Sequence, residues 1–193
     1  TTTFNGVEGT HVWKLGDIVQ STPKLKSSFA LNSYHLYPSE GYSDRTYYQF
    51  VNDVDAAGNP AGMYKNRGMV FVGANDGMLH AFELGKLTFN NLPANTAARL
   101  SVTDVDLGTE RWAYIPKGVL PYLKYLTSTG YCHTFYVNQP VTIFDASVVT
   151  GNSTAAKDRG SWRTILIGGM GIGGACRDNV ATCTNCVKTP ISG

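Results

Sequence analysis

Charged residues are scarce in this chain, and it has no long apolar run. Only 16% of the 193 residues are charged, and 16 Lys and Arg against 14 Asp and Glu give a formal net charge of +2. Nucleic-acid binding normally needs a clustered basic face, whereas the densest group of cations, Lys14, Lys24 and Lys26, is sparse. A membrane-spanning helix needs about 20 consecutive apolar residues. We therefore expect no nucleic-acid partner and no transmembrane segment.

Residues that favour turns and strands are abundant instead. The chain has 21 Gly, 8 Pro and 11 Tyr, and 42% of it is hydrophobic. Glycine and proline favour tight turns, and aromatic residues favour strands. The composition predicts a folded domain built from many short strands.

The clearest element is a β-hairpin within residues 68–83. Two apolar runs, residues 69–72 and 78–82, flank a turn that contains Asn75, Asp76 and Gly77. These three residue types tolerate the positive φ that tight hairpin turns require. Asp76 is expected to brace the turn through backbone hydrogen bonds, and His80 to pack within the second strand.

The remaining pattern predicts further strands and two short helices. β-branched and aromatic residues, in part alternating with polar ones, indicate strands at residues 11–20, 110–115, 133–137, 141–149 and 161–167. Helical spacing of apolar residues predicts one helix at residues 43–51, capped by Ser43, and another at residues 116–126. Residues 53–66 are interpreted as a polar loop and residues 90–106 as a weakly patterned connector.

Short strands at close intervals with few helices are typical of an all-β fold. Because four-stranded blade repeats run about 40–50 residues, the chain has room for about three or four blades of a β-propeller. An immunoglobulin-like sandwich fits less well, since the strand spacing is irregular and the Cys-Trp-Cys arrangement is missing. We expect a partial β-propeller with short helical insertions.

Several phrases of the sequence resemble those of known propellers. Residues 70–82 (VFVGANDGMLHAF) resemble the blade signature of quinoprotein-like propellers. Further phrases follow in a fixed order: residues 14–23 (KLGDIVQSTP), 108–116 (GTERWAYIP), 120–123 (LPYL), 133–142 (HTFYVNQPVT) and 162–171 (WRTILIGGMG). Together they resemble the opening part of the C-terminal propeller of the PilY/PilC family, the type IV pilus tip-associated adhesins. The resemblance covers roughly residues 11–175.

This resemblance implies where the protein acts and with what. Residues 1–193 would be a single domain, a fragment of a larger propeller with quinoprotein-like blades. The protein would be secreted, at the pilus tip or the outer-membrane surface, and would take part in pilus assembly, twitching motility, adhesion and surface sensing. Its partners would be type IV pilin and minor pilins, a host or abiotic surface, and the rest of its own propeller. Exposed loops such as residues 34–42 and the cysteine-containing tail would present the contacts.

Two other function classes stay open. One is a quinoprotein-like dehydrogenase, which would need repeated blade signatures and a quinone pocket; the other is a non-catalytic scaffold of the cell envelope. Because the ordered phrases favour the adhesin family, we expect no enzymatic activity. The chain departs from the family where residues 176–186 follow the glycine-rich phrase, and where the aspartate-rich calcium loop of the family has no convincing counterpart.

One loop has a weak likeness to a calcium site. Asp53, Asp55 and Asn59 place oxygen ligands at alternate positions, but calcium takes about six to eight oxygens. No glutamate closes the loop, and Tyr64 or Lys65 stands near the place where one belongs. An ordinary solvated loop is the favoured interpretation. Calcium is a cofactor that the sequence suggests only weakly, and no other cofactor is predicted.

Four cysteines, Cys132, Cys176, Cys183 and Cys186, are candidates for disulfides. The last two have the spacing of a zinc or redox pair, but zinc needs a fourth ligand, and haem attachment needs a histidine where Val187 stands. Disulfides are the usual state of cysteines in extracellular proteins. Sequence does not choose among the three possible pairings.

Titration of thiols in the unfolded protein tests the disulfide prediction. Under denaturing, non-reducing conditions we expect fewer than four of the cysteines of residues 1–193 to react with a thiol reagent, and all four after reduction. Four reactive thiols without reduction would contradict the prediction.

Overall fold

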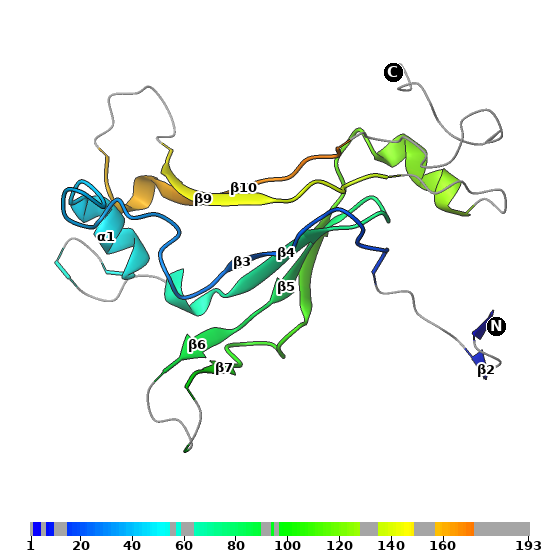
Figure 1. Ribbon diagram of the computed structural model, residues 1–193, viewed down its shortest axis with the longest axis horizontal. Helices are drawn as coiled ribbons and strands as arrows, with labels where there is room; N and C mark the ends of the chain where they lie inside the picture. The colour runs from blue at the N-terminus through cyan, green and yellow to red at the C-terminus, as the bar shows by residue number, and fades with distance from the viewer. Residues whose placement is uncertain are drawn as a thin grey trace.

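The structure is a computed structural model that describes residues 15–54, 57–58, 64–89, 94, 97–127, 135–148 and 157–171, together with the backbone of residues 2–4 and 7–9. In chain order, the elements are β1 (Thr2–Phe4), β2 (Val7–Gly9), β3 (Lys24–Lys26), α1 (Arg45–Val51), η1 (Tyr64–Asn66), β4 (Met69–Gly73), β5 (Leu79–Glu83), β6 (Lys86–Thr88), β7 (Arg99–Ser101), β8 (Glu110–Tyr114), η2 (Leu120–Thr127), β9 (Thr142–Ser147), η3 (Arg159–Ser161) and β10 (Trp162–Ile167). Antiparallel strands predominate, and the only helices in the described part are short (Figure 1). This confirms the all-β prediction. No described helix is long and apolar enough to cross a bilayer.

A four-stranded antiparallel sheet in the order β3-β4-β5-β8 forms the centre. Its β4–β5 hairpin is the one that the sequence predicts, with Met69 opposite Glu83 and Gly73 opposite Leu79. The hairpin closes where the Ala74 N–H donates to the Met78 carbonyl at 3.0 Å. Gly77 has φ of 92°, a conformation that glycine adopts without steric cost.

The β9–β10 hairpin lies against one face of this sheet. In Figure 1 it runs alongside β3 and β4, and residues of β9 are in contact with residues of β3. Side chains alternate across a strand, so one face carries Phe71, Leu79 and Ala81. These three residues belong to a buried core against which partly buried Ile143 and Leu166 of the hairpin pack. The resulting core also includes Val119, Tyr136, Val137 and Val141.

A second, aromatic core lies at the end of the hairpin where α1 packs. Tyr47, Val51, Tyr64 and Trp162 are buried together there. The Tyr47 and Trp162 ring centroids are 4.6 Å apart. Tyr47 and Val51 are four residues apart and so share one face of α1, as the sequence predicts. The helix cap differs from the prediction, because Asp44 and not Ser43 accepts the Tyr47 N–H, at 2.9 Å.

Two predicted strands are wrong in their described parts. Residues 15–20 form no strand, and the strand β3 comes after Pro23 instead. Residues 135–137 also form no strand, although they are buried. Both segments bind the hairpin turn: the Asn75 N–H donates to the Asp17 carbonyl at 3.0 Å, and the Tyr136 N–H donates to Asn75 Oδ1 at 3.3 Å. Their backbone groups therefore find partners outside a strand ladder.

Two further predictions need correction. The connector of residues 90–106 contains β7, which pairs with β6. The predicted helix at residues 116–126 is a 3₁₀ helix that begins only at Leu120. Pro121 lacks an N–H and its ring clashes with the carbonyl four residues back in an α-helix, while the Tyr122 N–H donates to the Val119 carbonyl three residues back, at 2.9 Å.

Gly73 is a position where the close packing of β4 on residue 137 can be tested. A Cβ at Gly73 would lie 2.0 Å from the Val137 carbonyl oxygen. We expect Gly73→Ala to lower the free energy of unfolding by about 1–3 kcal/mol, measured by urea denaturation. The matched change Gly118→Ala, where the nearest atom is 3.7 Å away, should stay within about 0.5 kcal/mol. Equal effects of the two changes would contradict the packing.

Candidate functional site

The β4–β5 turn is the first polar centre of the molecule. Asp76 Oδ2 accepts the Gly16 N–H at 2.9 Å, and Asp76 Oδ1 accepts the Met78 N–H at 3.0 Å. The Asn75 side-chain amide donates to Asp17 Oδ2 at 3.1 Å. Asn75 and Asp76 lie in the turn as the sequence predicts, and Gly77 is the one of the three turn residues with a positive φ. The turn thus joins β4 and β5 to the chain before β3.

His80 connects this turn to β8. The side chain is almost fully buried, with Nε2 2.9 Å from Asp76 Oδ2 and Nδ1 2.6 Å from Glu110 Oε1. Burial disfavours the charged ring, but the hydrogen bonds to Asp76 and Glu110 outweigh it and raise the pKa of His80. Burial likewise opposes the charged form of Asp76, while bonds from His80 and the Gly16 N–H hold the pKa of that carboxyl below its usual range. Both ring nitrogens are engaged, so the cluster is built to hold strands together.

Asp145 of β9 is the second polar centre and is completely buried. Its Oδ2 accepts the hydroxyls of Tyr47 and Tyr64, each at 2.6 Å, and its Oδ1 accepts the Thr164 hydroxyl at 2.7 Å. Burial, and then the bond to Asp145, raises the pKa of both tyrosines. These bonds satisfy the carboxylate, so that it links α1, η1 and β10.

Lys26 of β3 lies next to this centre. Only 5% of the residue is exposed. Its ammonium donates to the Tyr64 carbonyl and stands 3.5 Å from the centroid of the Tyr64 ring. Burial is the largest influence and lowers the pKa of Lys26 to about 8, although Asp145 and Asp53 favour the charged form.

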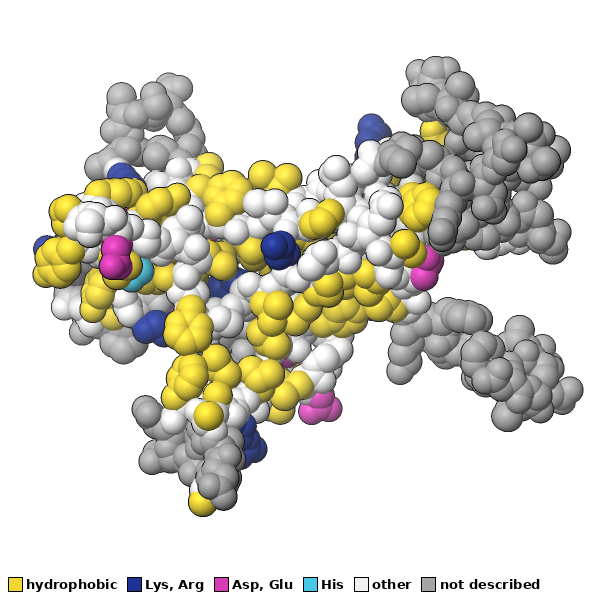
Figure 2. Space-filling model, in the orientation of Figure 1, with side chains coloured by type: hydrophobic (Ala, Val, Ile, Leu, Met, Phe, Trp, Pro, Cys, Tyr) yellow, Lys and Arg dark blue, Asp and Glu magenta, His cyan; other side chains and the backbone are white. Residues whose placement is uncertain are grey.

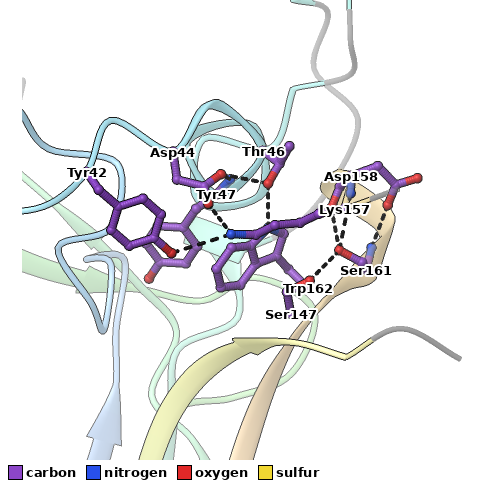
Figure 3. Close-up of polar contacts among 9 residues, drawn as sticks. All are labelled: Tyr42, Asp44, Thr46, Tyr47, Ser147, Lys157, Asp158, Ser161 and Trp162. Atoms are coloured by element: carbon purple, nitrogen blue, oxygen red, sulfur yellow. Dashed lines mark hydrogen bonds and ion pairs between the residues drawn. The ribbon is translucent and has the colours of Figure 1, made fainter. Parts of the chain in front are cut away.

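A third polar network ties α1 to the β9–β10 hairpin (Figure 3). Lys157 forms an ion pair with Asp44, the cap of α1, and lies 4.7 Å from the Trp162 ring. The Trp162 indole N–H donates to the Thr46 hydroxyl at 2.9 Å. Burial works against the charged Asp44 carboxylate, but the bonds from Lys157 and Thr46 lower its pKa to about 2.

The loop at residues 34–42 borders this network and is open to solvent. Tyr37 is 84% exposed and Tyr42 is 56% exposed. The Tyr42 ring packs against Tyr34, with centroids 5.5 Å apart. The sequence resemblance implies that this loop is a contact surface. Tyr37 and Tyr42 are exposed there, whereas Tyr34 packs against the aromatic core.

Other residues singled out from the sequence lie partly outside the described regions. Asp53 is described: its carboxylate accepts the backbone N–H groups of Tyr64 and Lys65, the latter at 3.0 Å. Asp55 and Asn59 lie outside the described residues, as do Cys132, Cys176, Cys183 and Cys186. Within the described part, no three metal-binding side chains gather. The calcium site and the disulfides therefore stay predictions.

Sequence comparison finds known proteins that are similar to this chain. A type IV pilus biogenesis factor PilY1 homolog of Xylella fastidiosa is 40% identical over 105 residues, 54% of this chain and 5% of that protein. A second homolog from that species is 30% identical over 163 residues, 83% of this chain and 10% of the relative. The type IV pilus biogenesis factor PilY1 of Pseudomonas aeruginosa strain UCBPP-PA14 is 29% identical, with the same coverage.

The chain is PilY1-like. It spans a tenth or less of the length of these relatives. No protein-family model matches the chain, and no solved structure matches it. The resemblance found in the ordered phrases of the sequence is thus confirmed by the alignments to PilY1 proteins.

The pH dependence of folding tests the His80 cluster in this PilY1-like chain. A raised His80 pKa stabilises the fold fully below the unfolded value of about 6.5, and the gain is lost as pH rises through the folded pKa. A lowered Asp76 pKa stabilises it above about 3.9, and that gain is lost as pH falls through the folded pKa. The cluster therefore contributes most between about pH 4 and 6.5.

We expect His80→Gln to cost about 1.5–3 kcal/mol of unfolding free energy near pH 5.5, and less as pH rises to 9. Urea denaturation across this range measures the difference. Glu110→Gln, which removes one of the two negative charges beside the ring but keeps an acceptor oxygen, should weaken the pH dependence without abolishing it. A wild-type advantage that is the same at every pH would show that the charged pair does not form.

Proposed function

We propose that this chain forms part of a β-propeller in a type IV pilus biogenesis factor that acts outside the cell, at the pilus tip or the outer-membrane surface. The observation that carries the proposal is the alignment to PilY1 proteins over 83% of the chain. The protein would support pilus assembly and twitching motility, and its exposed surface would serve adhesion and surface sensing.

The arrangement of the sheets supports the propeller part of this proposal. A propeller blade is a four-stranded antiparallel sheet, and here four strands follow the order β3-β4-β5-β8. The β9–β10 hairpin begins the next sheet and packs on the first through Ile143 and Leu166. Consecutive blades pack face to face in this manner.

Exposed apolar surface supports a place in a larger ring. Leu25 of β3 is 55% exposed, and Trp112 and Tyr114 of β8 are 43% and 58% exposed. Figure 2 shows hydrophobic side chains gathered over the part of the molecule that contains β4 and β5, with few charged ones among them. Such patches are typical of surfaces that meet a partner, and here the partner would be the rest of the propeller.

We further propose that the chain contributes contacts and no chemistry. In the described clusters, the functional atoms of His80 and Asp145 are bound to other side chains of the same fold. The exposed loop of residues 34–42 would take part in contacts with a host or abiotic surface. Type IV pilin and minor pilins would be the partners in assembly.

A genetic test follows in the organism that encodes the chain. Deletion of the gene should reduce surface pili and twitching motility, and the wild-type gene should restore both. Ala81→Asp, which places a charge in the fully buried core, should fail to restore them. Ala98→Asp, the same change at an exposed site, should restore them.

Surface pili are counted by electron microscopy and twitching is measured as the width of the motility zone. Unchanged pili and motility in the deletion strain would contradict the proposed function. Restoration by Ala81→Asp would contradict the assignment of the blade core.

A further inference from the structure

A cavity of about 670 Å³ lies between the central sheet and β10, at the end where α1 packs. Lys26 of β3, Phe71 of β4 and Trp162 of β10 contribute to its wall. Its size falls within the roughly 300–1,000 Å³ of small-molecule sites.

Positive charge dominates the lining. Lys26, Arg67, Arg159 and Arg163 all reach the cavity, whereas the lining carboxylate is that of Asp53. The Asp53 oxygens already accept two backbone N–H groups. None of the four cations has an ion-pair partner among the residues that the structure describes. The cavity thus has an excess of cations that its own carboxylate does not balance.

Two of the cations are held with hydrogen-bonding capacity to spare. Arg159 Nε is buried and has no hydrogen-bond partner in the described part of the chain, which is uncommon because buried polar atoms are nearly always paired. Lys26 is 5% exposed and binds one carbonyl, although its ammonium has three donors. An anion in the cavity would supply the missing acceptors.

Most of the uncharged wall is aromatic, with Met69 and Thr164 as the other lining residues. Phe50, Tyr64, Phe71 and Trp162 line the cavity together with the cations. The Phe50 and Tyr64 rings meet edge to face, with centroids 5.0 Å apart. Aromatic walls favour a ligand with a flat or ring-shaped body, because such a body buries much surface against them.

We propose that this cavity binds an organic phosphate whose phosphate group meets the four cations and whose ring packs against the aromatic wall. Arginine suits phosphate because its planar guanidinium donates two parallel hydrogen bonds. A phosphate carries more negative charge than a carboxylate, and so balances the excess of cations in the lining better. The site does not depend on the proposed role in pilus biogenesis.

Calorimetric titration of the full-length protein tests the site. The probes are phenyl phosphate and glucose 6-phosphate. Inorganic phosphate and phenol, the two component parts of phenyl phosphate, serve as controls. We expect saturable binding of at least one ring phosphate, at least about tenfold tighter than inorganic phosphate or phenol. A preference between the two probes identifies an aromatic or a sugar ring as the natural body.

Matched variants locate the binding. Lys26→Met and Arg67→Gln should each lower the affinity for the ring phosphate about tenfold or more, because each removes a charged hydrogen-bond donor. Lys24→Met, a change on the same strand at an exposed lysine, and Arg99→Gln on β7 lie outside the cavity lining. Both should bind as the wild type does. Arg67 is exposed, so its variant keeps the test valid if Lys26→Met fails to fold.

The pH dependence gives an independent readout. Asp145 and Asp53 favour the charged form of Lys26, and burial and Arg67 oppose it, for a pKa of about 8. Affinity in the wild type should therefore fall between pH 7 and 9.5, and this fall should be smaller in Lys26→Met. No saturable binding of either ring phosphate, binding equal to that of inorganic phosphate, or equal affinity in Arg67→Gln and the wild type would overturn the proposal.

Discussion

The hydrogen bonds of the Asn75–Asp76 turn are the constraint on which the described fold depends. This turn closes the β4–β5 hairpin, and the same two side chains hold segments that come from before β3 and from before β9. His80 of β5 contacts Asp76 and extends the connection to β8 through Glu110. Segments with no ladder of their own are thereby fixed against the sheet.

The local part of this arrangement could be predicted from sequence, and the distant part could not. Residues 69–83 carry a hairpin pattern and its turn in one continuous stretch. The strand patterns of β8, β9 and β10 likewise lie each within one stretch of sequence. Residues 15–20 have a strand-like composition, but the Gly16 N–H binds Asp76. Because that partner is far away in sequence, propensity alone gave the wrong element.

Burial of charge was the least predictable feature of the site. Lys26 belongs to a sparse group of cations in the sequence, which is typical of a solvated surface, yet it is buried beside Tyr64. Its burial depends on α1, η1 and β9, which meet only in the folded chain. Asp145 is an isolated aspartate in a strand, and its three hydroxyl partners come from three other elements. No spacing rule in the sequence connects these groups.

The interior and the surface of this PilY1-like segment differ in character. Saturated polar clusters and two cores make a rigid support, while exposed tyrosines and apolar strand surfaces face outward. The cavity near Lys26 differs from both, because four cations and a single carboxylate line it. Binding residues are often found on surface loops that a rigid scaffold positions.

Hydrogen exchange of individual backbone amides tests the role of the turn most directly. The amides of Gly16, Asn75 and Tyr136 lie outside every strand but bind across the turn. We expect that they exchange as slowly as the amides of β4 and β5, and that Asp76→Ala speeds the exchange of the Gly16 amide. Exchange of all three at the rate of open loops would contradict the account.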